Sequence, residues 1–348
     1  MNYRLLGNSG LRVSELSLGT MTFGEDWGWG AAKDEARKIY DLYRQQGGNF
    51  IDTANVYTNG SSERIVGDFV RDHRDQVVIA TKYTNDVAAL AGQYAGPNAG
   101  GNHRKSMMRA VEASLQRLGT DYIDLYWLHI WDQLTPVDEV MRAFDDLVTQ
   151  GKILYAGVSD APAWWVAQAN TLAEAHSWTR FAALQIEYSL VERTVERELI
   201  PMAHAFNLAL LAWSPLAGGL LSGKYKRGQE SGGRYDNEAN RGFMSRAETV
   251  DAVLTALEEI SKETNRSLAQ IALAWLRYRD IPVIPIIGAR KLSQFEDNLA
   301  SLTLDLTPEQ VKKLNEASAI KLGFPHEFYE NPMVKAMVYG GHPECIAR

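Results

Sequence analysis

Residues 123–158, IDLYWLHIWDQLTPVDEVMRAFDDLVTQGKILYAGV, carry the clearest evidence for the fold class. The apolar runs 123–127 and 153–158 do not alternate with polar residues, which is typical of strands buried on both faces. Between them, apolar residues recur at helical spacing. This predicts a helix with Thr135 as N-cap, Pro136 at its first position and Gly151 as its end. The stretch is therefore a strand–helix–strand unit with two parallel strands.

The same unit recurs along all 348 residues. Strands are predicted at 15–19, 49–52, 77–82, 123–127, 153–158, 182–186, 208–213 and 282–286. Helices are predicted between and after them, and two lie between the last two strands, at about 247–264 and 268–279. Eight such units predict an α/β fold, a (β/α)8 TIM barrel. The alternative, an open doubly wound sheet, is less favoured because no Gly-x-Gly-x-x-Gly follows the first strand.

The two ends of the chain add smaller features to the predicted barrel. Turn residues between short apolar runs at 6–11 predict an N-terminal β-hairpin, and Thr307 begins one extra helix. The tail after Ser318 is predicted to have irregular structure. No linker or shift in composition interrupts the chain, so we expect residues 1–348 to form a single domain.

Composition limits the classes of function. Lys and Arg number 36 against 43 Asp and Glu, a net charge of −7, which argues against a basic nucleic-acid surface or a polybasic membrane anchor. Cys345 is the one cysteine, and the histidines lack ligand spacing, so we expect no disulfide and no metal site. The first residues lack an apolar run, and we expect a cytoplasmic protein. The sequence does not predict the oligomeric state.

Ionisable side chains lie where successive predicted strands end. Asp52 ends the second strand with Tyr57 five residues on, Lys82 ends the third, and His129 follows the fourth. These strand ends meet on the rim where TIM barrels carry their active sites. An ammonium beside a phenol lowers the phenol's pKa, and a carboxylate holds that ammonium in place. With a histidine to bind a substrate oxygen, the set can protonate a carbonyl that receives hydride from a nicotinamide.

The sequence resembles the aldo-keto reductases over nearly its whole length, most closely the longer bacterial type with an extended loop after the seventh strand. The resemblance rests on residues 17–24, 50–57 (FIDTANVY), 80–82, 123–129, 151–159 (GKILYAGVS), 213–225 (WSPLAGGLLSGKY) and 284–290 (IPIIGAR). It implies NADPH-dependent, reversible reduction of aldehydes and ketones, with small-molecule carbonyl or alcohol substrates. In the implied catalytic tetrad, Tyr57 is the general acid, Lys82, paired with Asp52, lowers its pKa, and His129 orients the carbonyl.

The resemblance also implies an NADP(H) site across the barrel mouth. Ser159, Asp160 and Gln185 would hold the carboxamide, and Trp213 would stack on the nicotinamide ring. Ser214, Leu216, Gly218 and Lys224 would follow the pyrophosphate, with the loop 217–245 as a clasp. Gly288, Arg290, Gln294 and Asn298 would hold the adenosine end. The Arg290 guanidinium suits a 2′-phosphate, which favours NADPH over NADH.

Three tryptophans follow predicted strands on the same rim. Trp27, Trp29 and Trp131 are therefore predicted to line the substrate pocket. Two other functions stay open. One is a barrel aldolase in which Lys82 forms a Schiff base. The other is a cofactor-binding regulatory subunit without significant turnover.

Overall fold

The computed structural model describes residues 1–90, 92–223, 249–342 and 345. Eight parallel strands close into a barrel in the order β10-β3-β4-β5-β6-β7-β8-β9. They are β3 (Ser17–Gly19), β4 (Phe50–Asp52), β5 (Val78–Tyr83), β6 (Ile123–Leu128), β7 (Ile153–Ser159), β8 (Phe181–Glu187), β9 (Ala209–Trp213) and β10 (Val283–Ile287). Because β10 pairs with both β3 and β9, the predicted TIM barrel is confirmed and the open sheet is excluded.

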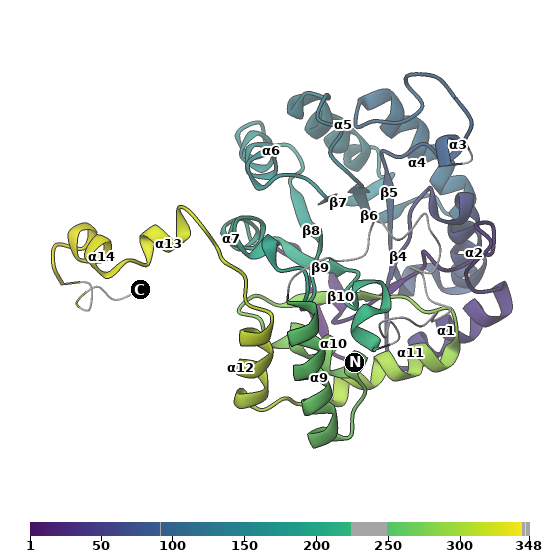
Figure 1. Ribbon diagram of the computed structural model, residues 1–348. Coiled ribbons are helices and arrows are strands. Elements are labelled where there is room, and N and C mark those ends of the chain that lie inside the picture. The colour runs from purple at the N-terminus through teal and green to yellow at the C-terminus, as the bar shows by residue number, and fades with distance from the viewer. Residues whose placement is uncertain (91, 224–248, 343–344, 346–348) are drawn as a thin grey trace.

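Helices surround the strands, as Figure 1 shows with the barrel in its centre. They are α1 (Lys33–Gln45), α2 (Ser61–Val70), α3 (Val87–Leu90), α4 (Arg104–Leu118), α5 (Val137–Thr149), α6 (Ala163–Ala175), α7 (Leu199–Ala205), α9 (Val250–Thr264), α10 (Leu268–Trp275), α11 (Leu292–Leu299) and α12 (Pro308–Ala317). Buried apolar residues such as Ile39, Phe144 and Val166 face the strands at helical spacing. No helix among the described residues has the length and apolarity needed to span a bilayer.

A hairpin closes the N-terminal end of the barrel. Strands β1 (Tyr3–Leu5) and β2 (Arg12–Ser14) pair antiparallel, which confirms the predicted hairpin. The buried side chains of Leu6 and Val13 join the apolar interior of the barrel. Gly7 has a φ of +56°, and a Cβ there would lie 2.3 Å from the carbonyl oxygen of Ala182, so only glycine fits this close approach.

Two local predictions were wrong. Helix α5 begins at Val137, with Pro136 rather than Thr135 at the N-cap position. The reason is that the Thr135 hydroxyl donates to Oδ2 of Asp132 at 2.6 Å and does not cap the helix. The tail is not wholly irregular either, because it contains α13 (His326–Tyr329) and α14 (Pro332–Val338).

Candidate active site

The structure brings Asp52, Tyr57, Lys82 and His129 together at the C-terminal ends of neighbouring strands. Lys82, fully buried, forms an ion pair with Oδ1 of Asp52. Its Nζ also donates to the carbonyl oxygen of Thr53 at 2.8 Å and to the Tyr57 hydroxyl at 3.3 Å. The rings of Tyr57 and His129 meet edge to face with centroids 6.0 Å apart. These four side chains form one connected group.

A tight turn positions Tyr57. It begins the 3-10 helix η1 (Tyr57–Gly60), in which Thr58 and Asn59 have φ of +44° and +52°. This left-handed backbone is held by surrounding bonds. The Thr58 hydroxyl donates to the carbonyl oxygen of Phe23 at 2.7 Å, and Trp27 Nε1 donates to Oδ1 of Asn59 at 3.3 Å. The phenol is thereby fixed over Lys82.

Burial and the charge of Lys82 act on the pKa of Tyr57 in opposite directions. Burial raises the pKa of Tyr57 above its ordinary value, and the Lys82 ammonium opposes that rise without cancelling it. Lys82 therefore acts on this pKa in the expected direction, but desolvation of the phenolate is the larger effect. Burial disfavours the Lys82 ammonium, but the attraction of Asp52 and Tyr57 raises the pKa of Lys82 above its usual range. Lys82 is therefore a cation.

His129 is a neutral imidazole with a defined tautomer. Burial, helped by the positive charge of Lys82, lowers its pKa well below the ordinary value. The Asn85 amide nitrogen lies 3.2 Å from Nδ1, and an amide nitrogen can only donate. Nδ1 is therefore the acceptor and Nε2 carries the proton, available for a substrate oxygen. Sequence reasoning missed Asn85, whose contact depends on the path of the loop after β5.

A cavity of about 660 Å³ opens beside this group. It is lined by Asp52, Tyr57 and His129 and by eleven of the residues predicted to bind the cofactor, namely Ser159, Asp160, Gln185, Trp213, Ser214, Leu216, Gly218, Gly288, Arg290, Gln294 and Asn298. Lys224, the twelfth, lies outside the described residues, as does most of the loop 217–245. The cavity continues from Asp52, Tyr57 and His129 to the N-terminal end of α11.

Hydrogen bonds between polar side chains fix their positions at the inner end of the cavity. The Trp213 indole donates to Oδ1 of Asp160 at 3.0 Å, and the Gln185 amide nitrogen donates to Oδ2 of Asp52 at 2.9 Å. Gln185 thus holds the Asp52 carboxylate as well as facing the cavity. Asp160 is open to the cavity, yet burial by the surrounding protein raises the pKa of its carboxyl.

The outer end of the cavity combines predicted residues with two, Ser267 and Asp297, that sequence reasoning missed. The Arg290 backbone nitrogen donates to Oε1 of Gln294 at 3.1 Å, which shapes the turn into α11. Asp297 accepts from the Ser267 hydroxyl at 2.8 Å and from the Gln270 amide at 2.7 Å. Ser267 and Asp297 both line the cavity. Ser267 is the N-cap of α10, and its place in the sequence gives no sign of a neighbour 30 residues away.

The three tryptophans predicted for the substrate pocket differ in position. Trp29 lines the cavity, whereas Trp27 packs against Trp29 with ring centroids 5.6 Å apart and is not part of the lining. Trp131 is also absent from the lining. Its ring centroid lies 5.5 Å from that of Trp164 and 6.4 Å from that of Trp165, both on α6. The loop after β6 directs its indole toward that helix.

Comparison with known proteins finds a family model and relatives that cover most of the chain. The model of the aldo/keto reductase family matches residues 15–319. A norsolorinic acid reductase of Emericella nidulans is 39% identical over 94% of this chain and 84% of its own length. An aldo-keto reductase of Aspergillus calidoustus is 38% identical, covering 93% and 84% of the two chains. An aryl-alcohol dehydrogenase [NADP(+)] of Phanerodontia chrysosporium is 37% identical, covering 93% and 87%.

Proposed function

The chain belongs to the aldo/keto reductase family, whose members are oxidoreductases, and from this premise we propose that it reversibly reduces aldehydes and ketones to alcohols with NADPH. The observation that carries the proposal is the Tyr57 hydroxyl, 3.3 Å from a buried, paired Lys82 and beside a neutral His129 at one end of the cavity. We assign Tyr57 as the proton donor to the carbonyl oxygen.

The cavity fits an extended nicotinamide dinucleotide. Its volume lies within the range of cofactor sites, and its length joins the catalytic side chains to α11. Ser214, Gly218 and Gly219 line its middle with φ of +49°, +64° and +99°, a backbone that leaves room for close approach of a pyrophosphate. When bound there, NADPH supplies the hydride. We expect Ser159, Asp160 and Gln185 at its carboxamide and Trp213 against its ring.

Proton transfer is the protein's part of the reaction. Tyr57 gives its hydroxyl proton to the carbonyl oxygen as hydride reaches the carbonyl carbon, so the alcohol gains one proton and one hydride. The Lys82 ammonium stabilises the resulting phenolate, and Asp52 keeps that ammonium in place. The proton on Nε2 of His129 orients the same oxygen. In alcohol oxidation the phenolate of Tyr57 takes the proton back.

Arg290 supports the choice of NADPH over NADH. It lines the end of the cavity next to Ser293 and Gln294, where we place the adenosine. A guanidinium binds a phosphate through paired, charge-assisted hydrogen bonds that a ribose hydroxyl does not offer. The name of the relative from Phanerodontia chrysosporium includes NADP(+), in agreement with this choice.

Aromatic carbonyl compounds are the substrate class we favour. Trp29 and Met21 line the cavity, and Trp27 packs behind Trp29. A flat indole wall suits a planar substrate. Relatives in the comparison are named for norsolorinic acid and for aryl alcohols. We place the reaction in the cytoplasm, where the single cysteine fits a reducing environment.

The aldolase alternative has little support in the geometry. Lys82 is fully buried, and its three ammonium hydrogens have three acceptors, on Asp52, Thr53 and Tyr57. A Schiff base requires a neutral, accessible amine, whereas the pKa of this one is raised. Borohydride trapping of a substrate on Lys82 without nicotinamide would reverse this judgement.

The proposed function is tested by the loss of NADPH absorbance with a panel of aromatic and aliphatic carbonyl compounds. Tyr57→Phe should abolish reduction while NADPH binding, followed by fluorescence, persists. Phe keeps the ring that packs against His129 and removes only the hydroxyl. NADPH binding by the unaltered protein without turnover of any compound would instead favour the regulatory subunit.

A further inference from the structure

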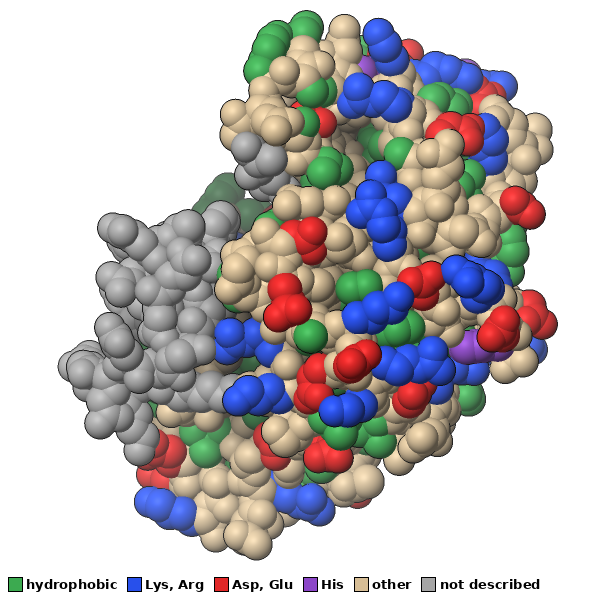
Figure 2. Space-filling view, turned by 90° about the vertical axis from the view of Figure 1, so that its right-hand side faces the viewer, with side chains coloured by type: hydrophobic (Ala, Val, Ile, Leu, Met, Phe, Trp, Pro, Cys, Tyr) green, Lys and Arg blue, Asp and Glu red, His purple; other side chains and the backbone are tan. Residues whose placement is uncertain are grey.

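The C-terminal arm, residues 319–342, stands away from the barrel. Figure 1 shows it leaving the end of α12 and carrying α13 and α14 outward. Its large apolar side chains are between 36% and 86% exposed, and they are Leu322, Phe324, Phe328, Tyr329, Met333, Met337, Val338 and Tyr339. By contrast, the face of the molecule in Figure 2 carries interspersed positive and negative side chains with small, separate apolar groups. The arm is therefore an unusual concentration of exposed apolar surface.

The root of the arm is fixed to the barrel beside α7. Arg197 donates to the carbonyl oxygen of Lys321 at 2.8 Å, and the His326 ring lies 3.1 Å from Glu198. These contacts direct the chain outward from that flank. Beyond them α14 is capped, because the Asn331 side chain accepts from the Met333 backbone nitrogen at 2.9 Å and Pro332 occupies the first turn.

A helix of this size needs a surface to pack against. α14 has seven residues, and isolated helices shorter than about 12 residues are marginal in water. Met333, Met337 and Val338 are each more than 65% exposed, so they do not stabilise the helix by packing on their own barrel. The capped helix and its apolar residues are therefore suited to a surface supplied by another molecule.

From these observations we infer that the arm packs on a second copy of this chain, in a dimer that exchanges its two arms. Eight apolar side chains on each arm, with the surfaces they cover, would bury on the order of 2,000 Å² in total, the size of a stable interface. A two-fold arrangement provides every contact twice. A single arm on an unrelated protein would bury only half this area.

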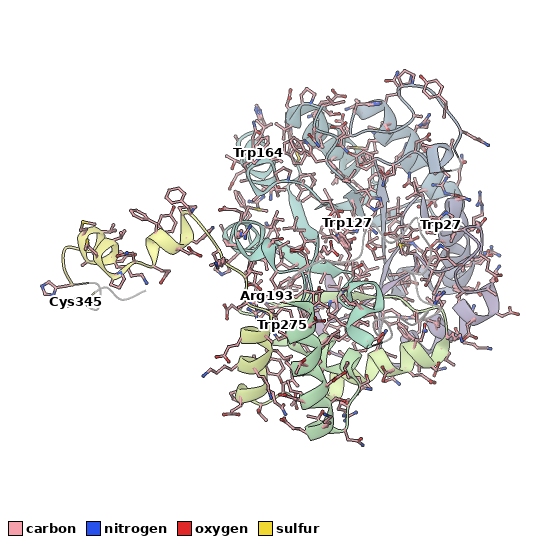
Figure 3. The ribbon with its side chains drawn as sticks, in the orientation of Figure 1. Trp27, Trp127, Trp164, Arg193, Trp275 and Cys345 are labelled. Carbon is pink, nitrogen blue, oxygen red and sulfur yellow. The ribbon has the colours of Figure 1, made fainter. Side chains whose placement is uncertain are left out.

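The receiving surface lies on the flank from which the arm leaves. Trp164, on α6, is 60% exposed and is found on that side in Figure 3. Its ring contacts Trp131, and the neighbours Ile130 and Leu134 in the same loop are also exposed. A two-fold axis beside α6 and α7 brings this group within reach of the other copy's arm. The arm would then cover the loop that follows His129 in its partner.

Sedimentation velocity of the full chain and its variants tests the exchange. We expect the unaltered protein to be dimeric at micromolar concentration. Met333→Glu with Met337→Glu, which alters the arm, should raise the dissociation constant at least a hundredfold, and Trp164→Glu, which alters the receiving surface, should do the same. Leu5→Glu is the matched control, since Leu5 is 58% exposed on the hairpin at the closed end of the barrel, and it should leave the dimer intact.

Mixing the two altered proteins makes the test specific. A heterodimer of the arm variant and the Trp164→Glu variant retains one unaltered arm on one unaltered surface, whereas neither homodimer retains any. Mixing should therefore restore dimers that neither protein forms alone. Unchanged far-ultraviolet circular dichroism and NADPH binding show that each variant is folded. A monomeric unaltered protein, or variants that stay dimeric, would overturn the inference and leave the proposed reaction untouched.

Discussion

The most informative perturbation of the site is Lys82→Met, which removes the ammonium beside Tyr57 and keeps most of the side-chain volume. At 3.3 Å and an effective dielectric constant of about 20, the attraction between ammonium and phenolate is about 5 kcal/mol. Tyr57 is half-buried, so solvent in the cavity weakens this interaction. We expect the acidity of the phenol to fall by roughly a hundredfold to a thousandfold.

Alcohol oxidation is the direction that reports this change. In the proposed mechanism it requires the phenolate of Tyr57, so its rate should rise with pH toward the pKa of that residue. Because burial already raises this pKa, the rise lies in the alkaline range in the unaltered protein. Lys82→Met should move it to higher pH and lower kcat for oxidation at pH 9 by a factor of about 100 or more.

A second variant separates catalysis from stability. Lys82→Met leaves the buried Asp52 carboxylate without its cation, a change that typically costs 3–5 kcal/mol of folding free energy. Adding Asp52→Asn removes both charges and should restore much of the stability but not the rate. Lys152→Met, at a lysine paired with Glu112 away from the barrel mouth, is the control. An oxidation profile unchanged between Lys82→Met and the unaltered protein would refute the assignment.

Three further predictions follow from the site. Arg290→Ala should weaken NADPH binding by roughly ten- to a hundredfold and NADH binding little, measured by fluorescence titration; equal losses would contradict a 2′-phosphate contact. Asp160→Asn should lower the pKa of Tyr57, because the Asp160 charge raises it, so the alcohol-oxidation profile should shift to lower pH. His129 is held neutral in the folded state, so the unfolded state binds its proton more readily, and stability should fall by about 1.4 kcal/mol per pH unit below pH ~6.5. Urea unfolding at pH 5.5 and 7.5 measures this loss of unfolding free energy, and His129→Gln should lack the part that is due to His129. An identical loss in the variant would show that His129 is not the group responsible.

Much of the barrel, and the grouping of the strand-end side chains, could be predicted because both depend on the order of residues along strands. In a closed parallel barrel all strands end on one rim, so Asp52, Lys82 and His129 had to meet once the strands were placed. Neighbouring strands also place Asp52 close to Lys82, since β4 pairs with β5. The tail helix α14 could have been found as well, because Asn331-Pro332 is a helix-start signal.

The paths of the loops and the degree of burial could not be predicted from the order of residues along the chain. Trp29 and Trp131 both follow strands, but only the structure shows that one lines the cavity and the other packs on α6. The contact from Asn85 to His129 likewise depends on where a loop turns. The pKa of Tyr57 is a balance between charge, which the sequence suggested, and desolvation, which depends on how closely the surrounding chain packs.

That balance has a consequence for the direction of the reaction. A raised pKa keeps Tyr57 protonated through the neutral range. In the proposed mechanism this is the form that reduces a carbonyl, whereas oxidation requires deprotonation at higher pH. The ammonium of Lys82 then acts mainly as the phenolate forms, since it stabilises a charge that is absent from the resting state. Burial and the Lys82–Asp52 ion pair therefore have complementary effects in this mechanism. Burial keeps the proton on Tyr57 before hydride transfer, and the ion pair stabilises the phenolate that forms when the proton leaves.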